Sequence, residues 1–237
     1  MKIQGSIVLV TGANRGLGKA LVAGLLDAGA AKVYAAARDE RTIARTDARV
    51  VPLRLDTTRP EQVAATATIA NDVTLLVNNA GVATSYNVLT ASQDAIDTDF
   101  RTNVAGTLAV IKAFVPVLEK SRGSTVVNVL SLASLGSFPA FGGYSASKAA
   151  AYSITQSLRA ELGRKQVHVL AALPGPIDTD MVKDLAMPKT SPTDVARGVL
   201  AGIERGDEEI FPDPMAEQMG AVWNRSPKEY ERAFANL

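Results

Sequence analysis

Short apolar segments alternate with longer helical segments along most of the chain. The apolar, β-branched runs fall at 6–10, 32–37, 49–55, 73–77, 124–130 and 167–173, with a candidate seventh at 208–212. The helical segments between and after them cover 16–29, 60–70, 93–120, 144–163 and 192–204. Continuous apolar runs of this length are typical of strands buried on both faces. The alternation therefore predicts an α/β fold, a doubly wound parallel sheet with helices on both faces.

Nothing in the chain suggests a second domain or a membrane segment. No linker rich in Pro, Gly or Ser interrupts residues 1–237, and the 47% hydrophobic content is enough for one large core, so we expect a single domain. The apolar run within the start "MKIQGSIVLVTG" is too short for a signal peptide. These features predict a cytoplasmic protein with no membrane partner.

Charge and residue counts exclude several kinds of chemistry. The net charge of +1 provides no basic face for nucleic acid. The chain has no cysteine, which excludes disulfides, thiolate catalysis and zinc–thiolate sites. His168 is the only histidine and lies within an apolar run, so we expect no metal site.

The first apolar run is followed by the glycine-rich stretch "TGANRGLG" at 11–18. In a parallel sheet the ligand lies beyond the carboxyl ends of the strands, and this stretch joins such an end to a helix. Glycines there permit a sharp turn and close approach of a ligand, and the free N–H groups of the helix face a pyrophosphate. The stretch predicts a dinucleotide site formed by Gly12, Asn14, Arg15, Gly16, Leu17 and Gly18.

The end of the second run predicts which dinucleotide is preferred. An acidic residue at this position would bind the 2′-hydroxyl of an NAD ribose, whereas this chain has Ala37 followed by Arg38. Arg38 and Arg15 together suit a ribose 2′-phosphate, because guanidinium groups bind phosphate through charged hydrogen bonds. Asp39, directly after Arg38, would partly neutralise it. We therefore predict NADP(H) rather than NAD(H).

Further motifs follow the other strands in a fixed order. They read "LDTT" at 55–58, "NNAG" at 78–81, "TNVAG" at 102–106, "NVLSLAS" at 128–134, "YSASK" at 144–148 and "LPGPIDTDM" at 173–181. With "TGANRGLG", this ordered set resembles the short-chain dehydrogenase/reductase family in its compact form. The resemblance covers residues 5 to about 181 and implies a Rossmann fold and hydride transfer between a nicotinamide and a carbonyl or alcohol.

The resemblance assigns roles to individual residues. It implies that Asn103 lies at a helix kink, where its backbone carbonyl holds a water near the active lysine, and that Ser131, Tyr144 and Lys148 are catalytic. It also implies cofactor contacts from Asp56, Thr57, Asn79, Ala80, Gly81, Tyr144, Lys148, Pro174, Gly175, Ile177 and Thr179.

The spacing of Tyr144 and Lys148 has a direct chemical meaning. Residues four apart share one face of a helix, so the ammonium would favour the phenolate and lower the phenol's pKa from about 10. Tyr144 would then donate a proton to a carbonyl oxygen, and Ser131 would give that oxygen a second hydrogen bond. The resemblance adds that Lys148 holds the nicotinamide ribose.

The segments expected to frame the substrate are apolar. They are 83–89, 132–143 and 181–188, and the loop at about 179–191 would form the substrate loop. These segments favour an apolar or aromatic carbonyl compound. The C-terminal tail, including Trp223, is expected to form a helical segment packed on the body or a partner. In the family, the helices corresponding to 93–120 and 144–163 pack against other subunits, which implies a homodimer or homotetramer.

Three alternatives remain open on sequence grounds. A 3-oxoacyl thioester reductase would need a basic patch near the pocket, for which the sequence offers Lys183 and Lys189. A catalytically silent NADP-sensing regulatory protein would keep the fold, but such proteins usually lose the tyrosine or the lysine. An epimerase or dehydratase acting on nucleotide sugars normally needs a larger C-terminal domain than the roughly 50 residues after Met187.

Overall fold

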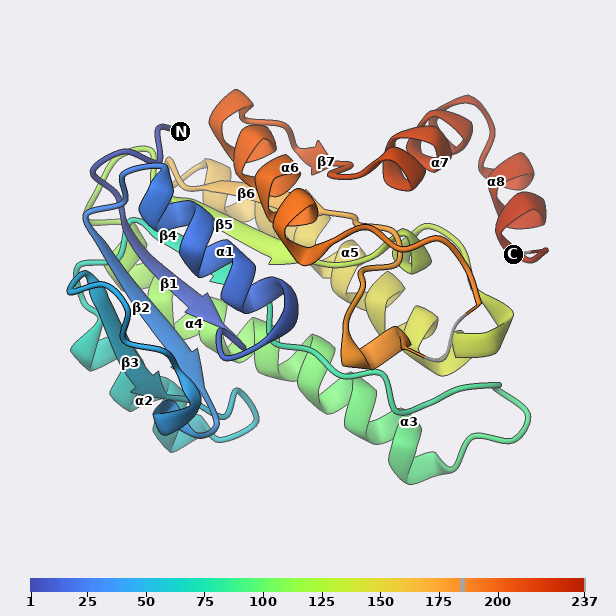
Figure 1. Ribbon diagram of the computed structural model, residues 1–237, viewed down its shortest axis with the longest axis horizontal. Helices are drawn as coiled ribbons and strands as arrows, with labels where there is room; N and C mark the ends of the chain where they lie inside the picture. Colours follow the sequence, from blue (N-terminus) through green and yellow to red (C-terminus); the bar gives the residue numbers. More distant parts are fainter. Residues whose placement is uncertain (184–185, 237) are drawn as a thin grey trace.

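The computed structural model describes residues 1–183 and 186–236 of the 237-residue chain. Its strands, all parallel, form one seven-stranded sheet in the order β3-β2-β1-β4-β5-β6-β7 (Figure 1). Each predicted strand has a counterpart, including the candidate seventh, so the prediction of a doubly wound α/β fold is confirmed. The strands are β1 (Ile7–Thr11), β2 (Lys32–Ala37), β3 (Val50–Arg54), β4 (Leu75–Asn78), β5 (Thr125–Val129), β6 (His168–Ala172) and β7 (Glu209–Ile210).

Helices cover both faces of the sheet. On one face α1 (Gly16–Asp27) packs against α6 (Pro192–Arg205), and their apolar sides meet the sheet in one core cluster (Figure 1). The other face is covered by α2 (Pro60–Ile69), α4 (Thr107–Leu118) and α5 (Gly142–Gly163), which contribute to a second cluster. Burial on both sides explains why the strand sequences are continuously apolar.

The predicted helix 93–120 consists of three pieces. It begins as α3 (Gln93–Asp99), continues as a π-helical segment over Phe100–Gly106, and ends as α4. Asn103 lies within the π-helical part, where the resemblance implies a kink. Over Gln93–Leu118 this helix has the length and apolar content of a membrane span, but a core helix packed on a sheet has the same composition.

The C-terminal tail forms two short helices, α7 (Pro214–Arg225) and α8 (Pro227–Phe234). Tyr230 of α8 is fully buried, and its hydroxyl donates to the backbone carbonyl of Leu132 at 2.6 Å. This bond attaches the tail to the short 3-10 segment Leu132–Ser134 after β5. The prediction that the tail packs as a helix on the body is therefore correct.

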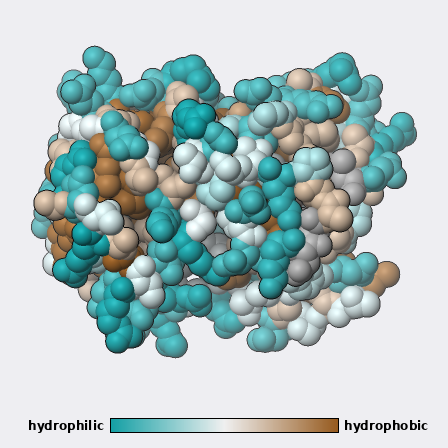
Figure 2. All heavy atoms as spheres, viewed as in Figure 1, coloured by the Kyte–Doolittle hydropathy of each residue, from teal (hydrophilic) through white to brown (hydrophobic). Residues whose placement is uncertain are grey.

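The strand order reverses between β1 and β4, which lie side by side at the centre of the sheet. The loops that follow these two strands lead to opposite faces and open a crevice between them. Figure 2 shows that the face bearing α1 and α6 is mostly hydrophilic, with apolar side chains gathered over α1. In doubly wound sheets, ligands bind in the crevice where the strand order reverses.

Candidate active site

A cavity of about 1200 Å³ lies at the carboxyl ends of the strands. It is lined by all of the predicted site residues except Asn103, which the topology brings together from seven separate segments. These lining residues are Gly12, Asn14, Arg15, Gly16, Leu17, Gly18, Arg38, Asp56, Thr57, Asn79, Ala80, Gly81, Ser131, Tyr144, Lys148, Pro174, Gly175, Ile177 and Thr179.

The glycine-rich stretch forms a close-packed turn into α1. Gly12 and Gly16 adopt positive φ angles of 66° and 51°, which L side chains rarely tolerate. A Cβ on Gly18 would lie 2.6 Å from the Asn79 amide nitrogen and would overlap the carbonyl oxygen of Gly12. The first turn of α1 has no side-chain cap and no acidic residue, so its N–H groups can receive an anion. These features fit the pyrophosphate of a dinucleotide.

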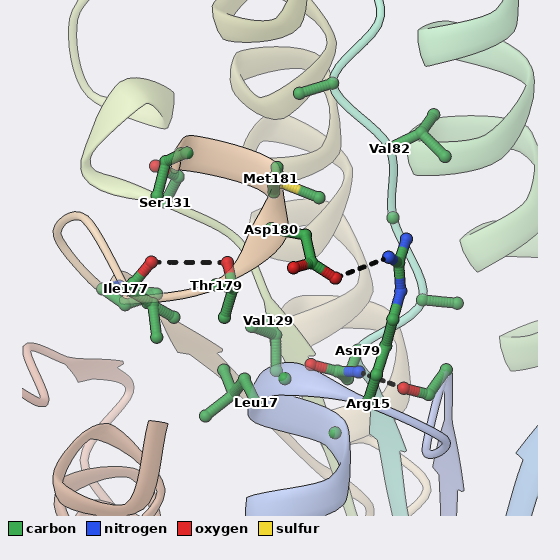
Figure 3. Close-up of a pocket in the computed structure, with 18 of the residues that line it drawn as sticks. Arg15, Leu17, Asn79, Val82, Val129, Ser131, Ile177, Thr179, Asp180 and Met181 are labelled. Atoms are coloured by element: carbon green, nitrogen blue, oxygen red, sulfur yellow. Dashed lines mark hydrogen bonds and ion pairs between the residues drawn. The ribbon is translucent and has the colours of Figure 1, made fainter. Parts of the chain in front are cut away.

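Arg15 and Arg38 differ in their partners. Arg15 reaches from the glycine-rich stretch to Asp180, with 3.1 Å between Nη1 and Oδ2, and this exposed ion pair crosses the cavity (Figure 3). Arg38 is not neutralised by Asp39 as the sequence suggests, because Asp39 binds Arg41 through two hydrogen bonds of 2.9 and 2.8 Å. A cationic group therefore stands at the end of β2.

Asp56 lies at the end of the next strand segment and is held in place by its neighbours. Its Oδ1 accepts from the backbone N–H and the hydroxyl of Thr58, at 2.9 and 2.7 Å. Burial acts to raise the pKa of Asp56, but these hydrogen bonds and the charges of Arg38 and Arg59 lower it overall. The carboxylate is thus available as an acceptor for a ligand donor on this side.

Asn79 and Ala80 connect β4 to the glycine-rich stretch. The Asn79 amide donates to the carbonyls of Thr11 and Gly12 at 3.0 and 3.1 Å. The hydroxyl of Thr11 accepts from the N–H groups of Asn79 and Ala80, both at 3.0 Å. The Asn79 side chain therefore holds the glycine-rich stretch in place. It lines the cavity beside Gly12.

Ser131, Tyr144 and Lys148 all line the same cavity. Tyr144 is in the first turn of α5, and the Lys148 ammonium lies 5.7 Å from the centre of its ring. The ammonium also donates to the carbonyl of Val129 at 3.0 Å. Ser131 follows β5 and caps the segment Leu132–Ser134 by accepting from the N–H of Ala133. A carbonyl compound in the cavity can therefore meet a phenol, a hydroxyl and a cation together.

Burial shifts the pKa values of this group. Burial raises the pKa of Tyr144 to about 12, and interaction with the Ser131 hydroxyl opposes the increase only in part. Burial also lowers the pKa of Lys148 to about 8. Burial of Tyr144 thus acts against the lowering of the phenol's pKa expected from the Lys148 ammonium, and that lowering stays a prediction. The phenol is protonated at neutral pH and able to donate.

Asn103 does not line the cavity. Its side chain accepts from the N–H of Val82 and donates to the carbonyl of Val82, both at 2.9 Å, and it also donates to the Ser147 hydroxyl at 3.0 Å. The side chain therefore joins the helix to the segment after β4 and to α5. The role implied for its backbone carbonyl stays a prediction.

Replacing Asn103 with Ala is expected to lower the free energy of unfolding by about 2–3 kcal/mol. The substitution removes three hydrogen bonds, two to the part-buried backbone of Val82 and one to the buried Ser147 hydroxyl, and each contributes about 1 kcal/mol. Urea unfolding of N103A, with Asn71→Ala as the exposed control, measures this. An unfolding free energy equal to that of N71A would show that the Asn103 contacts contribute nothing.

The part of the cavity beyond Tyr144 is apolar, but its lining differs from the prediction. Of the segment 83–89, Ala83 lines the cavity, whereas Leu89 is 94% exposed. The remaining apolar lining comes from the predicted segments 132–143 and 181–188 and from the C-terminal tail: Leu132, Ala133, Phe138, Phe141, Met181, Val182, Met187, Met215 and Phe234. Asp184 and Leu185, within the predicted substrate loop 179–191, lie outside the described residues.

Aromatic rings connect the tail to the reactive phenol. Phe141 lies 6.4 Å from Tyr144 and 6.0 Å from Phe138, measured between ring centres. Phe138 in turn lies 5.8 Å from Phe234 of α8. No chemical role for the tail was predicted, yet Met215 and Phe234 form one wall of the cavity. This part of the lining could not be predicted from the sequence, because it depends on the packing of α8 against Leu132.

Asp213 is a site residue that the sequence analysis did not identify. It is buried, and its carboxylate accepts from the N–H groups of Gly175 and Ala216, both at 2.9 Å. The residue thereby fixes the Pro174–Gly175 turn beside the cavity while capping α7. The stretch "PDP" at 212–214 contains the sequence signal for this role, since Asp before Pro is a common helix start.

In the described part of the chain, no cluster of three or more His, Asp or Glu side chains is arranged to hold a metal.

Dinucleotide-binding proteins typically have a cavity where the strand order of a doubly wound parallel sheet reverses, with the uncapped start of a helix in its wall. The chain belongs to the short chain dehydrogenase family, whose model matches residues 6–189. This family membership makes it an oxidoreductase of the class that acts on CH–OH and C=O groups with a nicotinamide dinucleotide. The resemblance found in the sequence motifs is thereby confirmed.

Relatives with solved structures share the whole fold. A short chain dehydrogenase from Burkholderia cenocepacia J2315, in complex with NADP, is 39% identical, with a TM-score of 0.94 over 99% of both chains. A short chain dehydrogenase/reductase from Burkholderia phymatum, in complex with NAD, is 26% identical, with a TM-score of 0.86 over 98% of this chain and 96% of the other. The 3-oxoacyl-[acyl-carrier-protein] reductase of Vibrio harveyi is 30% identical over 78% of this chain and 79% of its own length.

Proposed function

We propose that the protein is an NADPH-dependent carbonyl reductase that also works in reverse as an alcohol dehydrogenase. The main support is the convergence of Ser131, Tyr144 and Lys148 on a cavity that continues into the glycine-rich stretch. The cofactor, when bound, supplies or accepts the hydride. The residues that hold it in this proposal are the cavity-lining set from the glycine-rich stretch, Arg38, Asp56 and the segments after β4 and β6.

The chain's own residues manage the proton. Tyr144, protonated because of its raised pKa, donates its phenolic proton to the substrate oxygen as negative charge develops there. Ser131 donates a second hydrogen bond to the same oxygen. Lys148 is buried beside the ring, where its ammonium stabilises the phenolate that remains. The phenolate then takes up a proton from solvent, which restores the phenol.

The preference for NADP(H) rests on the cationic end of β2. Arg38 is exposed on the cavity and is not paired with Asp39, and no carboxylate stands at Ala37. The solved relative that shares 39% identity holds NADP, which supports the same preference. Arg15 can join a 2′-phosphate by releasing Asp180, since an exposed ion pair is worth little.

Arg38→Ala is expected to lower kcat/KM for NADPH by roughly tenfold to a hundredfold, the effect of losing a charged hydrogen bond. The value for NADH should change little, because NADH has no 2′-phosphate. Arg205→Ala, which removes an exposed arginine bound to Asp207 away from the cavity, is the matched control. Equal losses for both cofactors would contradict the assignment of Arg38.

The substrate proposed is an apolar or aromatic carbonyl compound. The cavity beyond Tyr144 is lined by phenylalanine, methionine and leucine side chains, which would bury the apolar surface of such a substrate with a gain in free energy.

A 3-oxoacyl thioester reductase is the second candidate, favoured by the likeness to the Vibrio harveyi reductase. The basic patch that this candidate needs is weakly developed, since the half-buried Lys189 ammonium is turned toward the Lys183 carbonyl, to which it donates. A silent NADP sensor is the third, and the intact Ser131, Tyr144 and Lys148 argue against it.

We also propose a cytoplasmic homodimer or homotetramer. Exposed apolar side chains occur near α3 and the π-helical segment, including Val88, Leu89 and Phe100 at 58%, 94% and 36% exposure. Apolar side chains at such positions are typical of interfaces between subunits.

Cofactor oxidation over a panel of carbonyl compounds tests the function. We expect NADPH turnover with aromatic and aliphatic ketones or aldehydes to exceed turnover with a 3-oxoacyl thioester. Faster turnover of the thioester would favour the second candidate. Cofactor binding without turnover in either direction would favour the sensor.

A further inference from the structure

Asp99, the last residue of α3, is a fully buried side chain bound to Thr84 and Ser85, and the Ser85 carbonyl in turn accepts from Tyr144 N–H. Its Oδ1 accepts from the N–H and the hydroxyl of Thr84 at 2.9 and 2.8 Å, and the Thr84 hydroxyl is shared with the Ala95 carbonyl. Its Oδ2 accepts from the N–H of Ser85 at 3.1 Å and from the Ser85 hydroxyl. Both oxygens of the Asp99 carboxyl group therefore serve as hydrogen-bond acceptors.

These bonds fix the segment that caps α5. The helix has no side-chain cap at its start, and its first free N–H groups instead meet backbone carbonyls of this segment. Tyr144 N–H donates to the Ser85 carbonyl at 3.3 Å, and Gly143 N–H donates to the Tyr86 carbonyl at 3.4 Å. A Cβ on Gly143 would overlap the Ser85 hydroxyl. The position of Tyr144 therefore depends on Ser85, and Ser85 depends on Asp99.

The charge of Asp99 acts on the same pair of residues. It raises the pKa of Lys148, opposing part of the decrease that burial causes, and it adds to the increase in the pKa of Tyr144. These are the two titratable groups of α5 beside it. The other titratable groups nearby, which are exposed, are Asp94, Asp97 and Arg101 on its own helical segment and Tyr86 on the segment it holds.

We propose that Asp99 is a positioning residue for the carbonyl reduction, holding the cap of α5 in place and providing a fixed buried negative charge to the Tyr144–Lys148 pair. This inference rests on the proposed function, because it concerns the proton that Tyr144 donates. The negative charge keeps both groups protonated, which is the state that reduction requires. An apolar residue at position 99 would leave the Ser85 hydroxyl and two N–H groups without acceptors.

Asp99→Asn tests the charge, because it keeps the size of the side chain and removes the negative charge. Without that charge both Lys148 and Tyr144 lose their protons at lower pH. The NMR titration of the Lys148 side chain, assigned with Lys148→Arg, should therefore lie at lower pH in D99N than in the wild type. The alkaline limb of kcat/KM for reduction should move in the same direction. Asp97→Asn, an exposed change on the same helix, should shift neither.

Ser85→Ala tests the positioning and serves where D99N does not fold. It removes the hydroxyl that Asp99 binds but keeps the carboxylate. We expect kcat to fall roughly tenfold through misplacement of Tyr144, with the NADPH dissociation constant unchanged. Wild-type kcat in S85A, or a D99N protein with an unshifted lysine titration, would overturn the inference. If the unsubstituted protein turns over no carbonyl compound, the proposed function fails instead, and the lysine titration still tests the charge.

Discussion

Tyr144→Phe is expected to lower kcat for carbonyl reduction by about 10²–10⁴-fold, the usual contribution of a general acid. The substitution removes one hydroxyl and leaves the ring beside Phe141, with 6.4 Å between the ring centres. The dissociation constant for NADPH should stay within about twofold of the wild-type value, because in this account the phenol's main contact is with the substrate. Steady-state turnover and cofactor fluorescence titration measure the two quantities.

Tyr152→Phe is the matched control for this variant. Tyr152 lies on the same helix, two turns beyond Tyr144, and its hydroxyl bonds the carboxylate of Glu209 at 3.2 Å away from the cavity. We expect Y152F to keep its turnover. Comparable losses in both variants would mean that Tyr144 matters only for the packing of α5.

Gly18→Ala should have the second large effect, on cofactor binding. The new Cβ would overlap the Gly12 carbonyl oxygen and lie 2.6 Å from the Asn79 amide nitrogen, and both belong to the fixed junction between β1 and β4. The start of α1 must therefore move away from the glycine-rich stretch. Overpacking of this kind costs about 1–3 kcal/mol, so we expect NADPH affinity to fall roughly tenfold to a hundredfold.

Gly163→Ala is the control for the glycine substitution. This exposed glycine ends α5, and a Cβ there meets nothing within 4 Å. The variant should bind NADPH normally and be slightly more stable, by up to about 1 kcal/mol, because alanine favours the helix. Normal NADPH affinity in G18A would show that the tight turn is not needed for the cofactor.

The fold was predictable because its signals are local. Runs such as "SIVLV" and "STVVNVL" specify buried strands by composition alone, and their alternation with helices leaves one sheet topology as the natural solution. The location of the cavity follows from the same pattern, since parallel strands bring their carboxyl ends to one edge. This is why residues as distant in sequence as Gly12 and Gly175 could be assigned to one cavity.

The features that were missed depend on contacts between distant segments. The burial that raises the pKa of Tyr144 cannot be seen in the spacing of two residues on a helix. The pairing of Arg15 with Asp180 depends on how the segment after β6 returns over the glycine-rich stretch. Likewise, Asp99 reads as an ordinary helix residue until the fold places Thr84 and Ser85 against it.

In the proposed function, NADPH transfers hydride to a carbonyl compound bound in this cavity, and Tyr144 donates the proton. The most direct test is the rate of NADPH absorbance loss for wild-type protein and Y144F with the best aromatic or aliphatic ketone or aldehyde from the panel. We expect rapid loss in the wild type and almost none in Y144F, although both proteins bind the cofactor equally. Equal rates in the two proteins would contradict the proposed function.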